Sequence, residues 1–187
     1  MDHYIDITLL PDPEFSPNLL MNALFAKLHR GLVETGKNRI GVSFPQHDDT
    51  RPTLGPVLRL HGNVEDLSRL MRHNWLNGMR DHVHSNEISP IPPPKGFRNV
   101  YRVQAKSNPE RLRRRYMKRH QADPKAAEEA IPDTVAEYLP LPWVTLGSHS
   151  TGQRFRLFIA HAPITGEATE GKFSHYGLSR NATIPWF

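Results

Sequence analysis

The chain has 187 residues, which is enough to bury a core in one large domain or two small ones. It carries 24 Lys and Arg residues against 19 Asp and Glu residues, and it contains no cysteine. The missing cysteines exclude disulfides, thiolate metal sites and a cysteine nucleophile, and are typical of a reducing compartment. No apolar run approaches membrane-spanning length, and residues 1–4 lack the features of a signal peptide. We therefore expect a soluble, cytoplasmic protein that does not act at a membrane.

The first 88 residues alternate between strand-like and helix-like patterns. Apolar residues alternate with period two in the strand-like segments and recur with a period of 3.6 in the helix-like ones. The predicted strands cover 4–10, 39–44, 57–61 and 81–88, and the predicted helices cover 17–36 and 63–79. This β-α-β-β-α-β order predicts a ferredoxin-like domain.

Residues 89–94 (SPIPPP) are rich in proline, which is typical of a stiff spacer. We therefore predict a domain boundary here, with a ferredoxin-like domain over 1–94 and a second domain over 95–187. Strand-like segments in the second domain cover 97–106, 143–146, 155–160 and 173–178, and a helix starts at Asp123-Pro124. The expected fold class is α+β, with the second domain a smaller α/β unit.

Residues 107–120 (SNPERLRRRYMKRH) combine a helix start with a dense basic run. Ser107 or Asn108 can cap this helix, and Pro109 suits its first turn. The glutamate three residues after Ser107 completes the pattern of a capping box. The sequence therefore predicts an Arg-rich helix over about 108–120.

The basic side chains of this helix gather on one face, because successive residues are about 100° apart. Leu112 and Tyr116, four residues apart, form a narrow apolar stripe that can dock the helix on the protein body. A charge run is most often a solvated face, but a capped helix with a docking stripe favours nucleic-acid binding. The basic face comprises Arg111, Arg114, Arg115 and Lys118, with Arg119 on its flank.

The positive charge of the chain is concentrated around this helix. The segment Lys95–His120 holds ten Lys or Arg residues and a single acid, Glu110. The rest of the chain carries 14 basic and 18 acidic residues, so it is mildly acidic. A positive field focused on one segment is what a polyanion-binding protein needs.

Motifs for metal or nucleotide chemistry are missing from the sequence. It contains no Walker loop, GxGxxG or GxSxG motif, and no close acidic pair of the kind that two-metal nucleases need. Of its eleven histidines, only His82 and His84 approach a metal-ligand spacing, as an HxH on a weak strand. We therefore expect neither a metal site nor a cofactor.

The remaining polar candidates suit RNA cleavage without a metal, because RNA supplies its own nucleophile. That reaction needs a base for the 2′-hydroxyl, alignment of this hydroxyl with phosphorus, and stabilisation of the phosphorane. His29 lies about a quarter-turn off the apolar face of the 17–36 helix and could be this base, or a polar edge residue. Ser148 could also be a turn residue and Tyr176 a core residue. Phe155 could be core or could stack on a base.

The stretch RVQAKSNPERLRRRYMKRH, at 102–120, resembles the CRISPR repeat-processing endoribonuclease of type I-F systems, in the repeat-associated RNA-binding superfamily. The resemblance covers essentially the whole chain. It includes MDHY-D, ALFAKLH, RIGVSFP, IPDTVA, STGQ-FRLFI and the terminal PWF, and its most specific block is QAKSNPERLRRR.

The resemblance implies a ferredoxin-like N-terminal domain and a C-terminal domain that bears the Arg-rich helix. Such enzymes bind the hairpin of each repeat in precursor CRISPR RNA and cut at the 3′ base of the stem without a metal. The product ends in a 2′,3′-cyclic phosphate, and the mature crRNA stays bound. The implied partners are therefore the repeat hairpin and the other subunits of a type I-F interference complex.

Position by position, the resemblance implies that His29 is the general base, Ser148 holds the nucleophilic 2′-hydroxyl and Tyr176 orients the imidazole. It also implies that Arg102 and Gln104 read base edges at the bottom of the stem. The other implied RNA contacts are Asn108, Arg111, Arg114, Arg115, Lys118, Arg119 and His120 in the basic helix, Phe155 on the terminal base pair, and Ser150 and Thr151 near the cut.

Two positions depart from the family pattern. Lys118 keeps the charge of the Arg-dominated face but cannot make a bidentate contact. The loop 177–183 has one glycine, where the superfamily has a glycine-rich loop. Two other functions stay open: a subunit that binds the hairpin without cutting it, and a general basic RNA chaperone.

Overall fold

The computed structural model describes residues 1–105, 109–132, 139–147 and 154–187. Its fold is mixed α+β, as predicted, with four α-helices and several antiparallel sheets in the described part of the chain. The residue contacts divide the chain into two compact units. One comprises Met1–Arg102 with Leu141–Phe187, and the other comprises Val103–Pro140.

The larger unit is built on a five-stranded sheet with the strand order β2-β3-β1-β4, in which β5 also pairs with β1. β1 is antiparallel to β3, β4 and β5, and β2 is antiparallel to β3. The alternation that predicted the first strand places Ile5, Ile7 and Leu9 in the core. The strands are β1 (His3–Leu9), β2 (Gly41–Ser43), β3 (Val57–Gly62), β4 (Val83–Ser85) and β5 (Ser89–Pro90).

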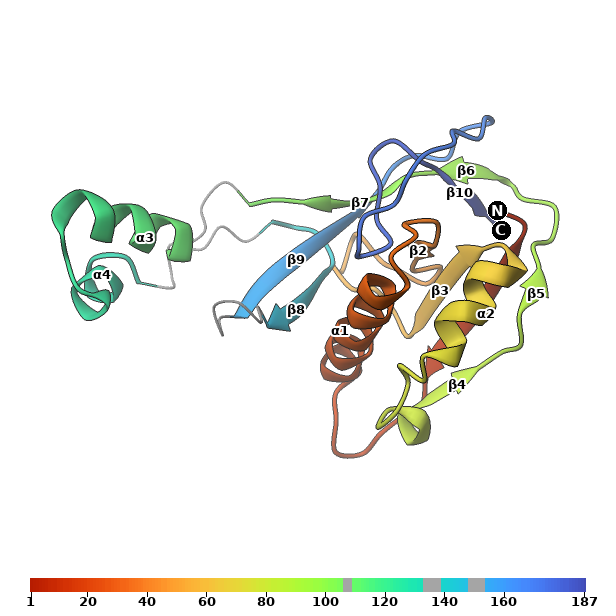
Figure 1. The fold of residues 1–187 in the computed structure, drawn as a ribbon, viewed down its shortest axis with the longest axis horizontal. Coiled ribbons are helices and arrows are strands. Elements are labelled where there is room, and N and C mark those ends of the chain that lie inside the picture. The colour runs from red at the N-terminus through yellow and green to blue at the C-terminus, as the bar shows by residue number, and fades with distance from the viewer. Residues whose placement is uncertain (106–108, 133–138, 148–153) are drawn as a thin grey trace. The chain divides into compact units, whose positions relative to one another are not determined.

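Two helices, α1 (Pro17–Thr35) and α2 (Val64–Arg72), lie side by side over this sheet (Figure 1). The Ser16 side chain accepts a hydrogen bond from the N–H of Leu19, which caps α1 as the sequence predicts. The apolar stripe of α1 is buried against the sheet, with Leu24, Phe25 and Leu28 fully inaccessible. The sheet and α1 therefore share one hydrophobic core.

The prediction that the second helix continues to residue 79 is wrong, since α2 ends at Arg72. Asn74 and Gly78 adopt positive φ angles of 49° and 72°, which a continuing right-handed helix does not allow. Trp75 and Met79 are nevertheless buried, so the helical periodicity of this segment reflected burial in a series of turns. A single 3-10 turn (Arg80–His82) then leads into β4.

Two smaller sheets complete the larger unit. β6 (Gly96–Arg98) pairs with β10 (Ile184–Trp186), and a second sheet has the order β7-β9-β8. The strand predicted over 97–106 is two strands, because the chain breaks at Asn99, whose side chain donates to the carbonyl of Ala182 at 2.8 Å. The strands of the second sheet are β7 (Val100–Val103), β8 (Trp143–Gly147) and β9 (Arg154–His161).

The strand predicted over 173–178 is a turn. The N–H of Gly177 donates to the carbonyl of Ser174 at 2.8 Å, and the N–H of Ser174 donates to Leu178 at 2.9 Å. These local bonds use the backbone groups that a strand would offer to a neighbour. The alternation of apolar residues in this segment reflects the burial of Phe173 and Leu178.

The two compact units do not follow the boundary predicted after residue 94. The proline-rich segment runs along the larger unit, where the N–H of Ile91 donates to Asp2 and the N–H of Lys95 donates to Trp186, both at 2.8 Å. Elements from both sides of the segment share one unit, because β10 packs beside β2 and β8 packs against α1. A proline-rich composition predicts a stiff segment, but it does not show which elements pack together across that segment.

The smaller unit contains α3 (Pro109–His120) and α4 (Pro124–Ala130). α3 corresponds to the predicted Arg-rich helix. Asp123 caps α4 by accepting a hydrogen bond from the N–H of Ala126 at 2.8 Å. No helix in the described ranges combines the length and the apolar character needed to cross a membrane.

Candidate functional site

His29 and Tyr176 lie face to face in the larger unit. Their ring centroids are 4.3 Å apart and the ring planes differ by 12°. The ring of Phe25, one turn earlier on α1, is nearly parallel to that of Tyr176, with 5° between the ring planes and 6.4 Å between centroids. Both members of the His29–Tyr176 pair are half-buried. Tyr176 therefore covers one face of the imidazole and limits its rotation.

The turn that carries Tyr176 is fixed against the sheet through backbone hydrogen bonds. The N–H of Val42 in β2 donates to the carbonyl of Gly177 at 2.8 Å, and the N–H of Phe173 donates to Asn38 at 3.0 Å. Gly177 has a φ of +71°, and a Cβ there would lie 2.2 Å from Cγ2 of Val42. Only glycine fits this approach without strain, so the position of Tyr176 depends on Gly177.

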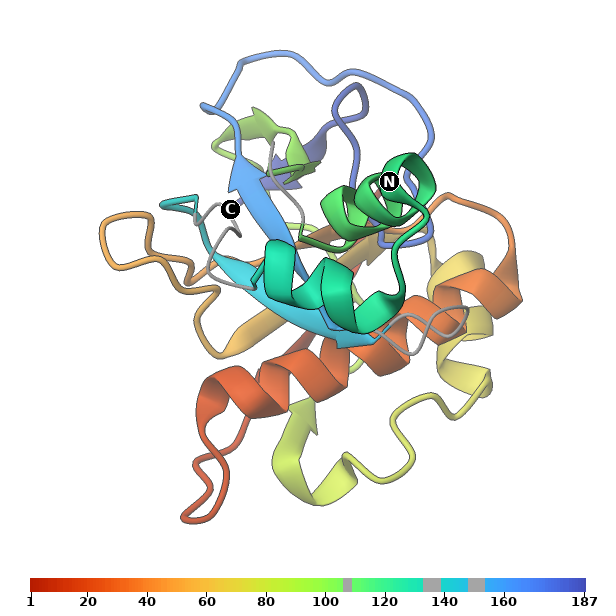
Figure 2. The same cartoon turned by 90° about the vertical axis from the view of Figure 1, so that its left-hand side faces the viewer.

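Strand β8 lies against α1 on the side seen in Figure 2. The side-chain oxygen of Asn22 on α1 accepts a hydrogen bond from the N–H of Thr145 at 2.8 Å. Asn22 is two helical turns before His29, so it lies on the same side of the helix. β8 ends at Gly147. The predicted site residues Ser148, Ser150 and Thr151 lie outside the described residues.

A second pair of predicted residues, Arg102 on β7 and Phe155 on β9, also meets in the larger unit. The guanidinium carbon of Arg102 lies 5.7 Å from the centroid of the Phe155 ring. Nε of Arg102 is buried and has no hydrogen-bond partner among the described residues. The side chain of Arg180 donates to the carbonyl of Arg102 at 3.4 Å and lies 4.6 Å from the Tyr101 ring centroid. Arg102 thus has a buried donor that a bound acceptor could satisfy.

The smaller unit presents the basic face of α3. Arg113, which the helical spacing excludes from this face, is turned toward α4, where its Nε donates to the carbonyl of Ile131 at 2.7 Å. The Tyr116 and His120 rings lie 4.5 Å apart, and Gln104 is exposed. The exposed residues of α3 that were predicted to bind RNA are Arg114, Arg115, Lys118, Arg119 and His120. Asn108 and the side chain of Arg111 lie outside the described part of the chain.

The predicted site residues therefore form separate groups. The pairs His29–Tyr176 and Arg102–Phe155 belong to the larger unit, whereas Gln104 and the basic face of α3 belong to the smaller unit. One backbone hydrogen bond joins the segments that carry Tyr176 and Arg102, since the N–H of Ser179 donates to the carbonyl of Val100 on β7 at 2.8 Å.

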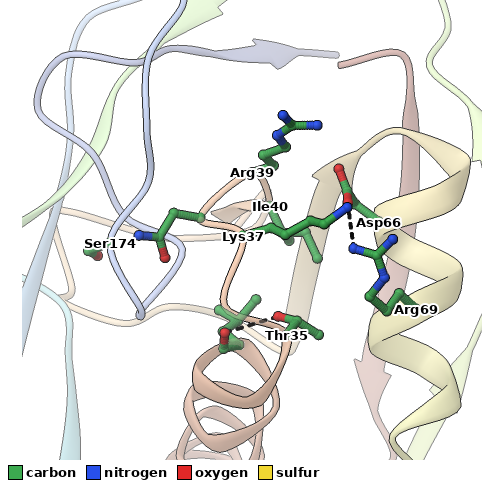
Figure 3. Close-up of a pocket in the computed structure, with 9 residues that line it drawn as sticks. Thr35, Lys37, Arg39, Ile40, Asp66, Arg69 and Ser174 are labelled. Atoms are coloured by element: carbon green, nitrogen blue, oxygen red, sulfur yellow. Dashed lines mark hydrogen bonds and ion pairs between the residues drawn. The ribbon is translucent and has the colours of Figure 1, made fainter.

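A small pocket beside the C-terminal end of α1 contains none of the predicted residues (Figure 3). Its charged side chains bind one another: Arg69 pairs with Glu65, and its guanidinium lies 3.6 Å from Oδ1 of Asp66. Lys37 also lies 3.7 Å from Glu65. We assign this pocket to the packing of α1 and α2, since Lys37 and Arg69 in its lining both lie near acidic residues of α2.

Two other histidines resemble catalytic groups only in part. Nε2 of His61 is 2.8 Å from Oγ of Ser43, but both side chains are fully buried, so a substrate cannot reach them. His82, of the HxH pattern, is held by Asp12 with 2.9 Å between Nδ1 and Oδ2, and His84 is exposed. Neither histidine is a candidate for the base.

Sequence reasoning missed the residues that position the site. Asn22 could have been found as a polar residue seven positions before His29 in an otherwise apolar stripe. Gly177 carried a weaker signal, as the lone glycine in its loop. Arg180 carried no signal, because an exposed arginine is ordinary on a basic protein.

Comparison with known proteins agrees with the resemblance found in the sequence. A family described as CRISPR-associated protein (Cas_Csy4) matches residues 4–187. The chain is 56% identical to the CRISPR-associated endonuclease Cas6/Csy4 of Pseudomonas aeruginosa (strain UCBPP-PA14), over the full length of both chains. It is 46% identical, again over both full lengths, to the CRISPR-associated endonuclease Cas6/Csy4 of Escherichia coli (strain UTI89 / UPEC). The chain therefore belongs to the Cas6/Csy4 family of CRISPR-associated endonucleases.

Proposed function

We propose that this chain is a metal-independent endoribonuclease that binds the hairpin of CRISPR repeat RNA and cuts it at the 3′ base of the stem. The observation that carries the proposal is the stacked His29–Tyr176 pair, held on α1 and on a turn fixed to β2. An imidazole with a restricted orientation suits proton transfer to and from one substrate atom. The relatives named above are endonucleases, which supports cleavage.

In the proposed reaction, His29 accepts the proton of the 2′-hydroxyl beside the cut. The resulting oxygen attacks the adjacent phosphorus, the bond to the 5′-oxygen breaks, and that oxygen takes up a proton. The products are a 2′,3′-cyclic phosphate and a free 5′-hydroxyl. Tyr176 keeps the imidazole plane in place, and Ser148 holds the hydroxyl that is deprotonated.

The same proposal gives the RNA two sets of contacts. Arg102 and Gln104 read base edges at the bottom of the stem, and Phe155 stacks on the terminal base pair. The unpartnered Nε of Arg102 and its position near Phe155 support this role. The exposed cations of α3 bind phosphates along the stem, and they supply most of the affinity. An A-form major groove is too narrow for readout except near the ends of a short stem.

We further propose that the larger unit contains a ferredoxin-like domain and that the enzyme stays on the mature crRNA as a subunit of a type I-F complex. The β-α-β-β-α-β order of the elements and the strand order β2-β3-β1-β4 support the domain assignment. Retention of the product follows from the phosphate contacts, because cleavage at the base of the stem leaves those contacts intact.

The test is single-turnover cleavage of the cognate repeat hairpin in EDTA. We expect a product with a 2′,3′-cyclic phosphate, and a His29→Ala rate at least about 100-fold lower. His73→Ala is the matched control, since His73 is an exposed histidine on another helix end. A hairpin with 2′-deoxyribose at the cut should bind and remain intact.

Other outcomes point to other functions. RNA that binds tightly but stays uncut under all conditions would make the chain a hairpin-binding subunit. Cleavage by His29→Ala at the parent rate would remove His29 from the mechanism. Equal binding of shuffled stems in a competition at fixed salt would indicate an RNA chaperone.

A further inference from the structure

Away from the His29–Tyr176 pair, three side chains form a second cluster of polar groups in the larger unit. His47 and Asp49 lie in the loop after β2, and His161 is the last residue of β9. One ligand atom from each lies within 4.8 Å of the other two. The two imidazoles stack, with 3.6 Å between centroids and 15° between planes. We refer to these residues as the His47–Asp49–His161 cluster.

His47 has a fixed tautomer in this cluster. Its Nδ1 lies 2.8 Å from the carbonyl oxygen of Phe44. A carbonyl only accepts hydrogen bonds, so Nδ1 carries a proton, and in the neutral ring the lone pair is on Nε2. Nε2 in turn lies 3.8 Å from Oδ2 of Asp49. An imidazole whose other N–H donates to a backbone carbonyl is the usual arrangement of a metal-binding histidine.

His161 provides an independent observation. Both of its ring nitrogens are buried, and neither has a hydrogen-bond partner among the described residues. A buried nitrogen without a partner costs stability unless a ligand satisfies it. A bound cation could satisfy one of the two buried nitrogens of His161.

We propose that the His47–Asp49–His161 cluster binds a late first-row divalent cation of the Zn²⁺ type. Two imidazole nitrogens and one carboxylate oxygen suit Zn²⁺, Co²⁺ or Ni²⁺, whereas Mg²⁺ and Ca²⁺ prefer an all-oxygen set. Three protein ligands leave a fourth position for water. The inference is independent of the proposed RNA chemistry, because the cluster shares no residue with it.

Binding requires the imidazole stack to open. In stacked rings the lone pairs lie in nearly parallel planes, so both nitrogens can reach one cation only if a ring tilts. Bonds of about 2.0–2.1 Å also draw the donor atoms closer together than they lie in the free cluster. The loop position of His47 allows this movement, whereas His161 is held in β9.

Arg98 is the charged group that opposes a cation here. Its guanidinium carbon lies 4.4 Å from the Trp186 ring centroid, and its Nε donates to the carbonyl of Ala162 at 2.8 Å. These contacts hold the positive charge near His161. Asp49 supplies the compensating negative charge, so its carboxylate should contribute strongly to affinity even though it is exposed.

The test uses the full-length chain, treated with EDTA, desalted, and titrated with Zn²⁺ against a chromophoric chelator. We expect one tight site per chain, no competition by Mg²⁺, and a Co²⁺ absorption spectrum typical of four-coordination. His47→Leu and Asp49→Asn should each weaken Zn²⁺ binding at least about tenfold. Both positions are on a loop, so neither variant depends on replacing the more buried His161.

The matched control is His73→Leu, because His73 also lies near a carboxylate, with 3.6 Å between Nδ1 and Oε2 of Glu34. This variant should bind Zn²⁺ like the parent. Zn²⁺ should also raise the melting temperature of the parent and shift the NMR signals of the His161 ring, and both effects should disappear in His47→Leu. Unchanged affinity in both His47→Leu and Asp49→Asn, or equal binding of Mg²⁺, would overturn the proposal.

Discussion

At the scale of single residues, the contact between His29 and Tyr176 is one of ring faces. The phenyl ring of phenylalanine makes such a contact equally well, because the hydroxyl group of tyrosine takes no part in it. We therefore predict that Tyr176→Phe cleaves the repeat hairpin within about threefold of the parent rate. Tyr176→Leu should be slower by about tenfold, since an aromatic pair contributes about 0.5–1.5 kcal/mol beyond its buried area. Single-turnover kinetics at saturating enzyme measure both rates.

Hairpin binding provides the control for this comparison. Neither Tyr176 variant should change the affinity for a hairpin with 2′-deoxyribose at the cut, because the role of Tyr176 is to orient His29. If Tyr176→Phe is as slow as Tyr176→Leu, the phenolic hydroxyl takes part in the reaction and the stacking model is wrong.

His61 couples stability to pH. Burial, and then Arg59, lower the pKa of His61 to about 3 in the folded chain, against 6.5 for the free side chain. Between these values the unfolded chain binds a proton that the folded chain excludes. The contribution to stability is therefore complete above about pH 6.5 and decreases as the pH falls, by up to about 1.4 kcal/mol per pH unit.

We predict that the free energy of unfolding of His61→Gln falls less steeply than that of the parent between pH 6.5 and 5. The difference in slope should correspond to about one proton fewer taken up on unfolding. Gln retains a polar partner for Ser43 but does not titrate. Urea unfolding at a series of pH values measures the difference. Parallel pH dependences in the two proteins would mean that His61 does not titrate on unfolding. His73→Gln, which changes an exposed histidine, should follow the parent.

At the scale of structural elements, the turn 173–178 links the site to β2 through Gly177. We predict that Gly177→Ala destabilises the fold by about 1–3 kcal/mol and also slows cleavage. A Cβ at this position would lie 2.2 Å from Val42 on a backbone with a φ of +71°, so the turn and Tyr176 must move. Urea unfolding and single-turnover cleavage measure the two effects.

Gly166→Ala is the matched control, since a Cβ there meets no atom within 4 Å. It should leave both stability and rate nearly unchanged. A Gly177→Ala variant with normal stability but slow cleavage would indicate a direct role for this loop at the RNA. Normal behaviour in both measurements would contradict the link between Gly177 and Tyr176.

The elements themselves could largely be predicted, because period and capping are local properties. Ser16 and Pro17 mark the start of α1, and the helical spacing of α3 separates Arg113 from the basic face before any contact is known. The end of α2 could not be predicted, since buried Trp75 and Met79 continue a helical period through turns. Apolar spacing reports burial, and turns can bury residues too.

At the scale of the whole molecule, the division into units was hidden from the sequence. Proline-rich segments suggest spacers, but residues 89–94 lie along the larger unit, and β8, β9 and β10 return to that unit after the helices of the smaller one. The His47–Asp49–His161 cluster was hidden for the same reason. His161 is distant along the chain from His47 and Asp49, so the sequence shows no spacing that joins all three ligands. Pairings between distant segments create both features.

The distribution of charge gives the last prediction, which concerns the salt dependence of RNA binding. Residues 95–120 include ten Lys or Arg residues, but the side chains of Arg98 and Arg113 bind groups within the protein. Among the side chains of α3 that the structure describes, the exposed Lys and Arg residues are Arg114, Arg115, Lys118 and Arg119. We expect the slope of log K against log salt to reflect the exposed cations, at about 0.7–0.9 per phosphate neutralised.

Arg114→Ala and Arg113→Ala separate these two kinds of arginine, because each removes the same charge from the same helix. Arg114→Ala should lower the slope by about one, measured with the uncleavable 2′-deoxy hairpin at several salt concentrations. Arg113→Ala should leave the slope unchanged but lower the melting temperature, because Arg113 holds α4 through Ile131 and lies 3.9 Å from Glu128. Equal reductions of the slope would show that the total charge, and not the exposed face of α3, determines the salt dependence of RNA binding.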